Sequence, residues 1–374
     1  MIRFRILSLQ RFLPVALLAL SMIVVSSLRS EPSAQMLLPD LSGKVIYFTE
    51  DNNEASLFDR SEYGMSRFAG LLQLAGAQLF PLDWRRDIPP DADMVFIGGA
   101  QDNLSNAQVG RLWAYLSNGG RVLFIVDPLA VGVRRGIVGM QFSDENGSTR
   151  GLFELTWPDM GIRARDDVVI RPDVGDVAMP SELSVPTIEE QGDLVYFGTD
   201  RYETSHPILA GVENELWFFG ARSVEFDASI QPFQASPLVF APEGYYGETA
   251  YEEYITGGPL PFYSAEDTNP NTLAIAAASE NLATGARIVV VGDREFLTNG
   301  AGLQTSPPNT TNFLYPDNVI FGLNIVGWLL EAEPSPEAEL TFEPPLPTAT
   351  PTPFLAPTAT PLPDTEATEG EANE

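Results

Sequence analysis

The 374-residue chain contains no cysteine, one histidine and one lysine. Without cysteine, the protein can form no disulfide bond, thiolate metal site or cysteine nucleophile, and no cysteine can carry a lipid anchor. The sequence also lacks the Gly-x-Ser-x-Gly elbow of many serine hydrolases and the glycine loops that hold nucleotide phosphates. These absences remove the commonest sequence signatures of nucleophilic hydrolysis and nucleotide binding.

Positive charge is scarce as well. The chain has 51 acidic and 21 basic residues, a formal net charge of -30, and residues 31–330 alone hold 41 acids against 17 bases. Such a surface repels nucleic acid, so we expect no nucleic-acid partner. The acid-rich stretch 50–62 lacks the central glycine of a calcium loop. We therefore expect neither a metal ion nor a cofactor.

The first thirty residues have the pattern of a membrane-targeting segment. The uncharged run Phe12 to Leu28 follows Arg3, Arg5 and Arg11. Its length is at the lower limit of about 17–25 residues for a spanning helix, and the preceding arginines favour a cytoplasmic N-terminus. We expect residues 1–30 to anchor the protein in the cell membrane as a single span, with the remainder outside the cytoplasm. The alternative is a cleaved signal segment and a secreted protein.

The composition changes abruptly at Glu331. From there to residue 374 proline, threonine, alanine and glutamate dominate, with ten acids and no base. Such sequence buries too little apolar surface to fold on its own. It predicts a disordered C-terminal tail over 331–374.

Residues 43–330 alternate between strand and helix patterns. Apolar runs at 44–49, 78–82, 93–99, 121–128 and 286–291 predict strands, and helical spacing is found at 63–75 and 105–116. This order predicts one α/β domain, a three-layer sandwich with a mostly parallel sheet. Residues 172–285 carry shorter runs broken by proline and glycine, and 241–271 reads as a long exposed loop whose tyrosines could bind sugar or peptide.

Small and acidic residues follow the predicted strands. Gly98 and Gly99 end one strand, Asp127 follows the next, and Gly292 and Asp293 end the run at 286–291. Carboxyl ends of parallel strands meet at one edge of the sheet, where α/β folds place ligand-handling groups. These five residues are candidates for ligand binding, although a glycine pair can simply turn the chain and an aspartate can cap a turn. We assign no catalytic residue.

His206 is the sixth candidate. It precedes Pro207, which restricts it to extended backbone at a loop or strand edge. A functional histidine needs a nucleophile, a carboxylate or a metal as its partner. The favoured interpretation is a structural histidine that hydrogen-bonds the backbone of its own loop.

A family resemblance lies in the order of several segments. They are Gly43–Phe48, Tyr63–Gly76, Leu116–Pro128, Gly151–Leu155, Met160–Ile170, His206–Ile208, Ala221–Phe226, Val291–Asn299 and Asn324–Leu329. In this order they resemble the extracytoplasmic domain of auxiliary components of ABC-type transport systems, the GldG-like family. The resemblance implies a class I glutamine amidotransferase-like fold without the nucleophile, which agrees with the absence of cysteine. The family offers no catalytic residues to carry over.

The resemblance implies a non-enzymatic, membrane-anchored binding or scaffold domain outside the cytoplasm. Its expected partners are the membrane subunits of an ABC transporter. The alternative is a degenerate amidotransferase-like hydrolase that uses Asp127 and Asp293, assisted by His206. The two hypotheses differ in geometry, because the hydrolase requires these three side chains to converge in one pocket.

Overall fold

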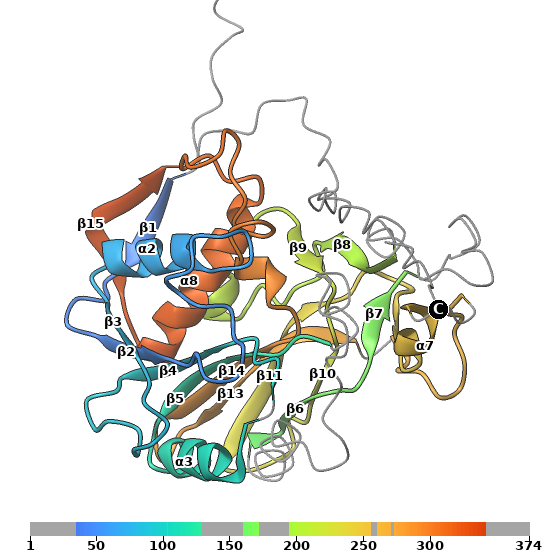
Figure 1. Ribbon diagram of the computed structural model, residues 1–374, viewed down its shortest axis with the longest axis horizontal. Coiled ribbons are helices and arrows are strands. Elements are labelled where there is room, and N and C mark those ends of the chain that lie inside the picture. Colours follow the sequence, from blue (N-terminus) through green and yellow to red (C-terminus); the bar gives the residue numbers. More distant parts are fainter. Residues whose placement is uncertain are drawn as a thin grey trace, which may run out of the picture.

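The computed structural model describes residues 35–102, 104–128, 160–171, 194–255, 260–270 and 273–341. They form a mixed α/β fold with a large central sheet and few helices (Figure 1). The expected N-terminal membrane segment lies outside the described residues. In the part of the chain that is described, no helix combines the length and the apolarity needed to cross a membrane.

Five strands of the central sheet are parallel, as the sequence predicts. In spatial order they are β3 (Gln78–Pro81), β2 (Val45–Phe48), β4 (Met94–Gly98), β5 (Arg121–Ile125) and β14 (Ala286–Val291). All five point the same way, so their carboxyl ends share one edge of the sheet and their amino ends share the opposite edge.

The other part of the sheet is antiparallel, so the expectation of a mostly parallel sheet is wrong there. Strand β13 (Ala274–Asn281) lies antiparallel to β14, and β10 (Val224–Phe226), β6 (Ile162–Ala164) and β11 (Phe233–Phe240) continue the sheet in antiparallel pairings. Only four residues separate β13 from β14. A link that short can join antiparallel neighbours but cannot hold the crossover that parallel strands require.

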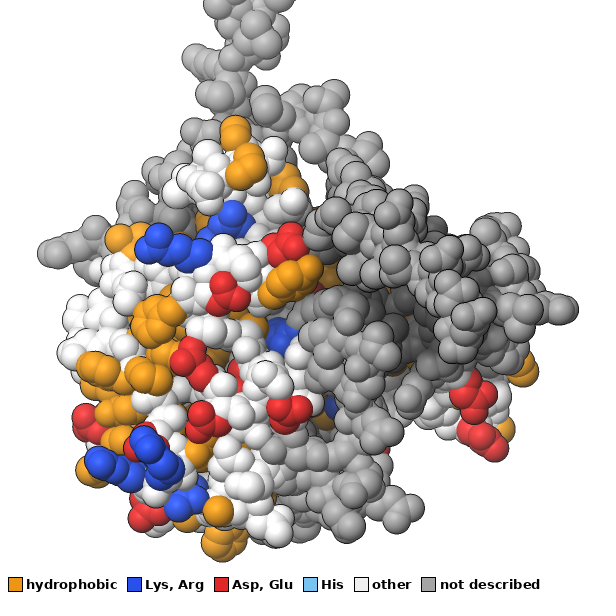
Figure 2. All heavy atoms as spheres, viewed as in Figure 1, with side chains coloured by type: hydrophobic (Ala, Val, Ile, Leu, Met, Phe, Trp, Pro, Cys, Tyr) orange, Lys and Arg blue, Asp and Glu red, His pale blue; other side chains and the backbone are white. Residues whose placement is uncertain are grey.

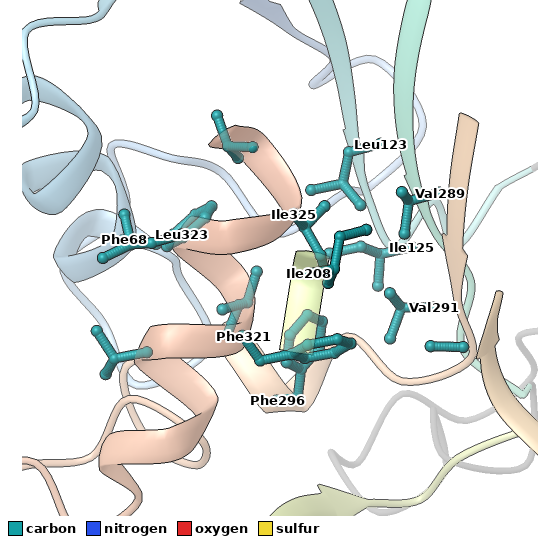
Figure 3. Close-up of a cluster of buried hydrophobic side chains, with 14 of the residues drawn as sticks. Phe68, Leu123, Ile125, Ile208, Val289, Val291, Phe296, Phe321, Leu323 and Ile325 are labelled. Carbon is teal, nitrogen blue, oxygen red and sulfur yellow. The ribbon is translucent and has the colours of Figure 1, made fainter. Parts of the chain in front are cut away.

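Both faces of the parallel strands are buried, which explains their continuous apolar sequences. Leu123 and Ile125 of β5 face one apolar cluster, while Val122 and Phe124 face the other. Helices α2 (Ser66–Leu74) and α8 (Pro316–Leu330) contribute to the first cluster, and α3 (Asn106–Ser117) contributes to the second. Figure 3 shows side chains of α8 packed against those of β5 and β14.

Local sequence signals set the ends of the first two helices. Gly76 follows α2 with a φ of +101°, a conformation that favours glycine. Ser105 caps α3: its hydroxyl accepts the amide of Gln108, and the Gln108 side chain accepts the amide of Ser105. This reciprocal pair is a capping box. The sequence predicts both boundaries correctly because each depends on neighbouring residues.

Two small sheets flank the central one. Strand β7 (Val168–Ile170) pairs with β12 (Tyr246–Glu248), and β8 (Tyr196–Thr199) pairs with β9 (Leu216–Phe219). The stretch predicted as a long exposed loop therefore contains β12 and also helix α7 (Tyr251–Ile255). Tyr246, Tyr251 and Tyr254 are each at most 3% exposed and pack in a small apolar cluster. The expectation of exposed tyrosines is wrong at these three positions.

The beginning of the predicted disordered tail is also structured. Strand β15 (Pro334–Thr341) pairs antiparallel with β1 (Gln35–Pro39). The tail prediction is therefore wrong for 334–341, whereas 342–374 lie outside the described residues. A two-stranded ribbon tolerates prolines because its outer edges need no ladder hydrogen bonds. In the sequence, β1 follows the apolar run Phe12 to Leu28 and β15 precedes residues 342–374, and the ribbon places these two strands side by side.

Candidate functional site

The carboxyl edge of the parallel strands assembles five of the six predicted ligand-binding residues. Gly98 ends β4 and Gly99 follows it, Asp127 follows β5, and Gly292 and Asp293 follow β14. Since β4 pairs with β5 and β5 pairs with β14, the three strand ends are neighbours. The prediction that they meet at one edge is confirmed, and what they bind remains a prediction.

A buried ion pair occupies this edge. Arg294 Nε lies 3.2 Å from Asp127 Oδ2, and the two side chains are only 3% and 8% exposed. The Arg294 amide donates to Asp127 Oδ1, so one carboxylate receives both the side chain and the backbone of the same residue. Arg294 Nη1 also donates to the carbonyl of Gly99 at 3.3 Å. Arg294 thus connects the ends of all three neighbouring strands.

Asp293 is fully buried and holds backbone amides. Its Oδ2 accepts the amide of Phe219 at 2.6 Å, and its Oδ1 accepts the amide of Glu295 at 2.8 Å. Phe219 ends β9, so the carboxylate joins this small sheet to the central one. The two hydrogen bonds fix the Asp293 side chain in place.

The glycines are required by close packing at this edge. Gly99 has a φ of +74°, and a Cβ there would collide with the side chain of Arg294. A Cβ on Gly292 would collide with the carbonyl oxygen of Arg222. The Arg222 amide donates to the Gly292 carbonyl at 2.8 Å. Because these glycines have no side chain, Arg294 and Arg222 can pack directly against the strand ends, where a ligand would otherwise approach.

Arg222 is the second buried arginine of the edge. Its Nη2 donates to Asp166 Oδ1 at 2.7 Å, and its Nη1 donates to the carbonyl of Asp127 at 3.4 Å. Burial lowers the pKa of the Arg222 guanidinium, and the charges of Asp166 and Asp167 oppose that shift. The guanidinium ties the loop before β7 to the end of β5.

Three carboxylates at this edge have a spacing that could hold a metal ion. Oxygens of Asp127, Asp293 and Glu295 all lie within 4.8 Å of one another. However, Arg294 already supplies a positive charge to Asp127, and Asp293 directs both oxygens at backbone amides. Asp127 and Asp293 therefore already have partners within the protein, and the geometry fits an internal ion-pair cluster.

The residues after this edge continue to connect distant segments. Asn299 Nδ2 donates to the carbonyls of Asp59 and Ser61, and its Oδ1 accepts the amide of Arg67. In α8, Asn318 Oδ1 accepts the amide of Trp217, and its Nδ2 donates to the carbonyl of the same residue. The block from β14 through α8 therefore fastens the entry to α2 and the strand β9 to the central sheet.

His206 lies apart from the strand-end cluster. Its Nδ1 accepts the amide of Ile208 at 3.2 Å, and its ring lies 5.4 Å from that of Trp328 near the end of α8. The charges that act on it are Glu203, Glu280 and Arg287. Arg287 is the second residue of β14, so this histidine lies toward the amino edge of the sheet. The favoured interpretation, a hydrogen bond to its own loop, is confirmed, and the three-residue hydrolase site is not assembled.

Sequence reasoning missed Arg222, Arg294 and Glu295. All three are at most 8% exposed, although charged residues are rarely buried without partners. Arg294 and Glu295 directly follow the singled-out Gly292–Asp293 pair, which was the available signal. Nothing local reveals that Arg294 pairs with Asp127, because 166 residues separate them.

The protein is thus a mixed α/β domain in which the carboxylates at the strand ends contact other residues of the same chain. A family model described as an ABC-type uncharacterized transport system matches residues 43–325, and the chain belongs to this family. The resemblance seen in the motif order is thereby confirmed. A comparison with curated proteins found no match.

Solved structures offer only distant similarity. The mmIFT52 N-terminal domain is 15% identical with a TM-score of 0.44, over 76% of this chain and 97% of the other. A cytoplasmic protein from Salmonella typhimurium is 12% identical with a TM-score of 0.41, over 76% and 98%. At these TM-scores neither structure supports a statement about the function of this chain.

Proposed function

We propose that the protein is a non-enzymatic accessory component of an ABC-type transport system. In this proposal it is a binding or scaffold domain held outside the cytoplasm by residues 1–30, and it docks on the membrane subunits of the transporter. Membership of the family supports the link to transport. The apolar run Phe12 to Leu28, with arginines before it, supports the anchor.

The observation that carries the non-enzymatic part is the filled carboxyl edge. A general base or nucleophile must reach its substrate within hydrogen-bond distance. Asp293 is 0% exposed and Arg294 is 2% exposed. Their polar atoms contact Phe219, Glu295, Gly99 and Asp127, which all belong to this chain. These contacts support a structural use of the strand-end charges.

Affinity capture tests the transport role. The full-length protein, with residues 1–30 intact, is captured from detergent-solubilised membranes and its partners are quantified by mass spectrometry. We expect ATP-binding and membrane subunits of a transporter to be enriched over a capture with an unrelated anchored protein. Their absence would overturn the proposal. The variant Phe262→Ser removes an aromatic side chain that is 70% exposed, and it tests whether this surface contributes to docking.

The location can be tested with single cysteines, because the native chain has none. Gly70 on α2 is exposed, and a Cβ there would meet no atom within 4 Å, so Gly70→Cys should fold normally. We expect a membrane-impermeant maleimide to label this cysteine in intact cells or spheroplasts. Labelling only after lysis would contradict a domain outside the cytoplasm.

A further inference from the structure

Two acidic side chains face each other in the lobe formed by β7, β12 and α7, outside the strand-end cluster. Segment 260–270 passes β12 there: the Gly247 amide donates to the Thr268 carbonyl at 3.2 Å, and the Thr268 amide donates to the Gly247 carbonyl at 2.9 Å. This exchange marks an antiparallel pair, so the next two residues, Glu248 and Asp267, stand directly opposite each other. Side chains in such a pair have Cβ atoms about 4.5–5.5 Å apart.

Glu248 is buried beside apolar groups. It is 5% exposed and pairs with Val168 of β7, which belongs to the same apolar cluster as Tyr246. Its Oε1 accepts the amide of Ala250 at 2.8 Å, and its Oε2 accepts the Tyr246 hydroxyl at 3.4 Å. Both donors are neutral. A charged carboxylate at this position therefore loses its hydration without gaining a positive partner from these contacts.

Asp267 has better hydrogen-bond donors than Glu248. Its Oδ1 accepts the amide and the hydroxyl of Thr249 at 3.1 and 3.2 Å, and its Oδ2 accepts the Ser264 amide at 2.6 Å. Burial raises the pKa of Asp267, but these donors lower it more, so the pKa lies below 3.8. Burial raises the pKa of Glu248 above 4.5, the Ala250 amide opposes that shift, and Asp267 adds to it. The pair thus holds one proton, on Glu248.

The elements around Glu248 bring further acids and tyrosines, namely Asp167, Tyr251, Glu253, Tyr254, Tyr263 and Glu266. Asp167 lies on the opposite face of β12, because a Cβ on Gly247 would collide with its Oδ2 and successive residues of a strand face opposite sides. Arg171, which follows β7, acts on Tyr245, whose ring packs against the main core. Figure 2 shows acidic side chains toward the lower right, beside the position of α7 in Figure 1.

Segment 260–270 covers part of the tyrosine cluster. The ring of Tyr263 lies edge-on to that of Tyr246, with centroids 5.3 Å apart, and the two residues are 50% and 1% exposed. Besides the two backbone hydrogen bonds to β12, the hydroxyl of Thr268 donates to Asp167 Oδ2 at 2.6 Å. Separation of the segment from β12 exposes the Tyr246 ring.

We propose that Glu248 and Asp267 form a pH-sensitive switch that holds segment 260–270 closed over Tyr246. The segment is closed while the two carboxyl groups hold one proton. When that proton leaves, two like charges stand directly opposite each other, which is a destabilising arrangement. The segment then separates from β12. This proposal does not rest on the transport role.

The sign of the pH dependence follows from the pKa shifts. In the open segment Glu248 has its ordinary pKa of 4.5, so between 4.5 and the raised pKa the closed form binds a proton that the open form does not. Closure is therefore favoured at low pH and is lost as the pH rises through the raised pKa. The contribution of Asp267 is lost only as the pH falls below 3.8, so it is constant in the tests that follow.

Hydrogen exchange of the full-length protein tests the switch. Peptides that contain Gly247 and Thr268 report closure, because their amides join the segment to β12. Mass spectrometry measures their protection factors at pH 5 and pH 8, corrected for the intrinsic pH dependence of exchange. We expect protection to fall on the order of tenfold at pH 8, the effect of one unit of pKa shift. Peptides from the β13–β14 pair should keep their protection.

Three variants sharpen the test. Glu248→Gln cannot ionise, keeps an oxygen for the Ala250 amide and donates to Asp267, so it should keep the segment closed at both pH values. Asp267→Asn keeps one acceptor oxygen and removes the charge opposite Glu248, so it should reduce the pH dependence, and it serves if the first variant does not fold. The matched change in the same segment is Glu266→Gln at an exposed position, which should leave the pH dependence intact.

Three results would overturn the proposal. The first is equal protection of the Gly247 and Thr268 peptides at pH 5 and pH 8. The second is a pH dependence that persists in Glu248→Gln, which would assign the titration to another group such as Asp167. The third is a loss of protection that extends to the β13–β14 pair, which would describe unfolding of the whole domain.

Discussion

The two edges of the parallel sheet differ in what occupies them. At the carboxyl edge Asp293 and Arg294 are at most 2% exposed and contact their own chain. At the amino edge Arg111 is 25% exposed, and the space beside Gly110 is open. Ligands of open α/β sheets usually bind at the carboxyl edge. In this protein the carboxyl edge holds the fold together, and a groove of about 910 Å³ lies at the amino edge, beside α3.

The cause is the path of the chain between β9 and β10. This segment crosses the carboxyl edge, where Phe219 donates its amide to Asp293 and Arg222 donates its amide to Gly292. The antiparallel extension of the sheet therefore brings protein backbone to the place where a ligand would sit. A glycine and an aspartate at a strand end are typical of a binding site, but Gly292 and Asp293 contact the polypeptide itself.

The largest expected effect is at the buried ion pair. Arg294→Met leaves Asp127 buried without its cationic partner, and it should lower the free energy of unfolding by about 3–5 kcal/mol. Denaturant titration followed by circular dichroism measures this change. The loss of stability comes from a buried carboxylate that no longer has Arg294 as its ion-pair partner. The double variant Arg294→Met with Asp127→Asn should therefore recover part of it.

The exposed pair of Arg85 and Asp83 is the control. Its side chains are 90% and 39% exposed, so Arg85→Met should leave the stability almost unchanged. Equal losses of stability from Arg294→Met and Arg85→Met would show that the buried ion pair does not stabilise the carboxyl edge.

The sequence predicts the parallel half of the sheet well because the signals there are local. Continuous apolar runs identify the strands, Ser105 caps α3, and Gly76 ends α2. The same logic places Gly98, Asp127 and Asp293 at one edge, since carboxyl ends of neighbouring parallel strands must meet.

The rest depends on contacts between distant residues. The pairing of Arg294 with Asp127 follows from the fold and not from either local sequence. Strand β15 was missed because its proline and glutamate content resembles that of a disordered tail, and only its pairing with β1 orders it. The local sequence does not predict that Tyr246 and Tyr254 are buried, because the apolar residues that bury them, such as Val168, are far away in sequence.

A smaller loss is expected at Asp293. Asp293→Asn keeps one acceptor oxygen but turns an NH₂ group toward one of two buried amides, those of Phe219 and Glu295. One buried amide without an acceptor costs about 1–3 kcal/mol. The matched change is Asp227→Asn at an exposed turn, where solvent can replace the contact with Ser229, and it should have little effect. A similar stability for both variants would remove the structural role of Asp293.

Two glycines, one at each edge, should respond in opposite directions. Gly99→Ala imposes a side chain at a φ of +74° and against Arg294, and it should cost about 1–2 kcal/mol. Gly110→Ala places a methyl group in open space on α3 and should stabilise the protein by up to about 1 kcal/mol. Thermal unfolding of the two variants beside the native protein checks both signs. A loss at Gly110 would mean that the amino edge is as tightly packed as the carboxyl edge.

The smallest effect concerns His206, which lies toward the amino edge. Burial lowers its pKa from the ordinary value of 6.5, while Glu203 and Glu280 raise it and Arg287 lowers it further. Between the lowered pKa and 6.5 the unfolded chain binds a proton that the folded chain does not. Stability should therefore fall as the pH decreases below about 6.5. Protonation of Nδ1 would also remove the acceptor for the Ile208 amide.

The variant His206→Asn keeps an acceptor at this position and does not titrate, so its stability should fall less between pH 7.5 and pH 5.5. Asp293→Asn, at the other edge, should leave this histidine-dependent difference unchanged, because Glu203, Glu280 and Arg287, the charges that act on His206, lie away from the carboxyl edge. Denaturant titrations of the two single variants and the double variant at both pH values form a thermodynamic cycle. A coupling between the two substitutions would connect edges that the geometry separates, since independent sites give additive free energies.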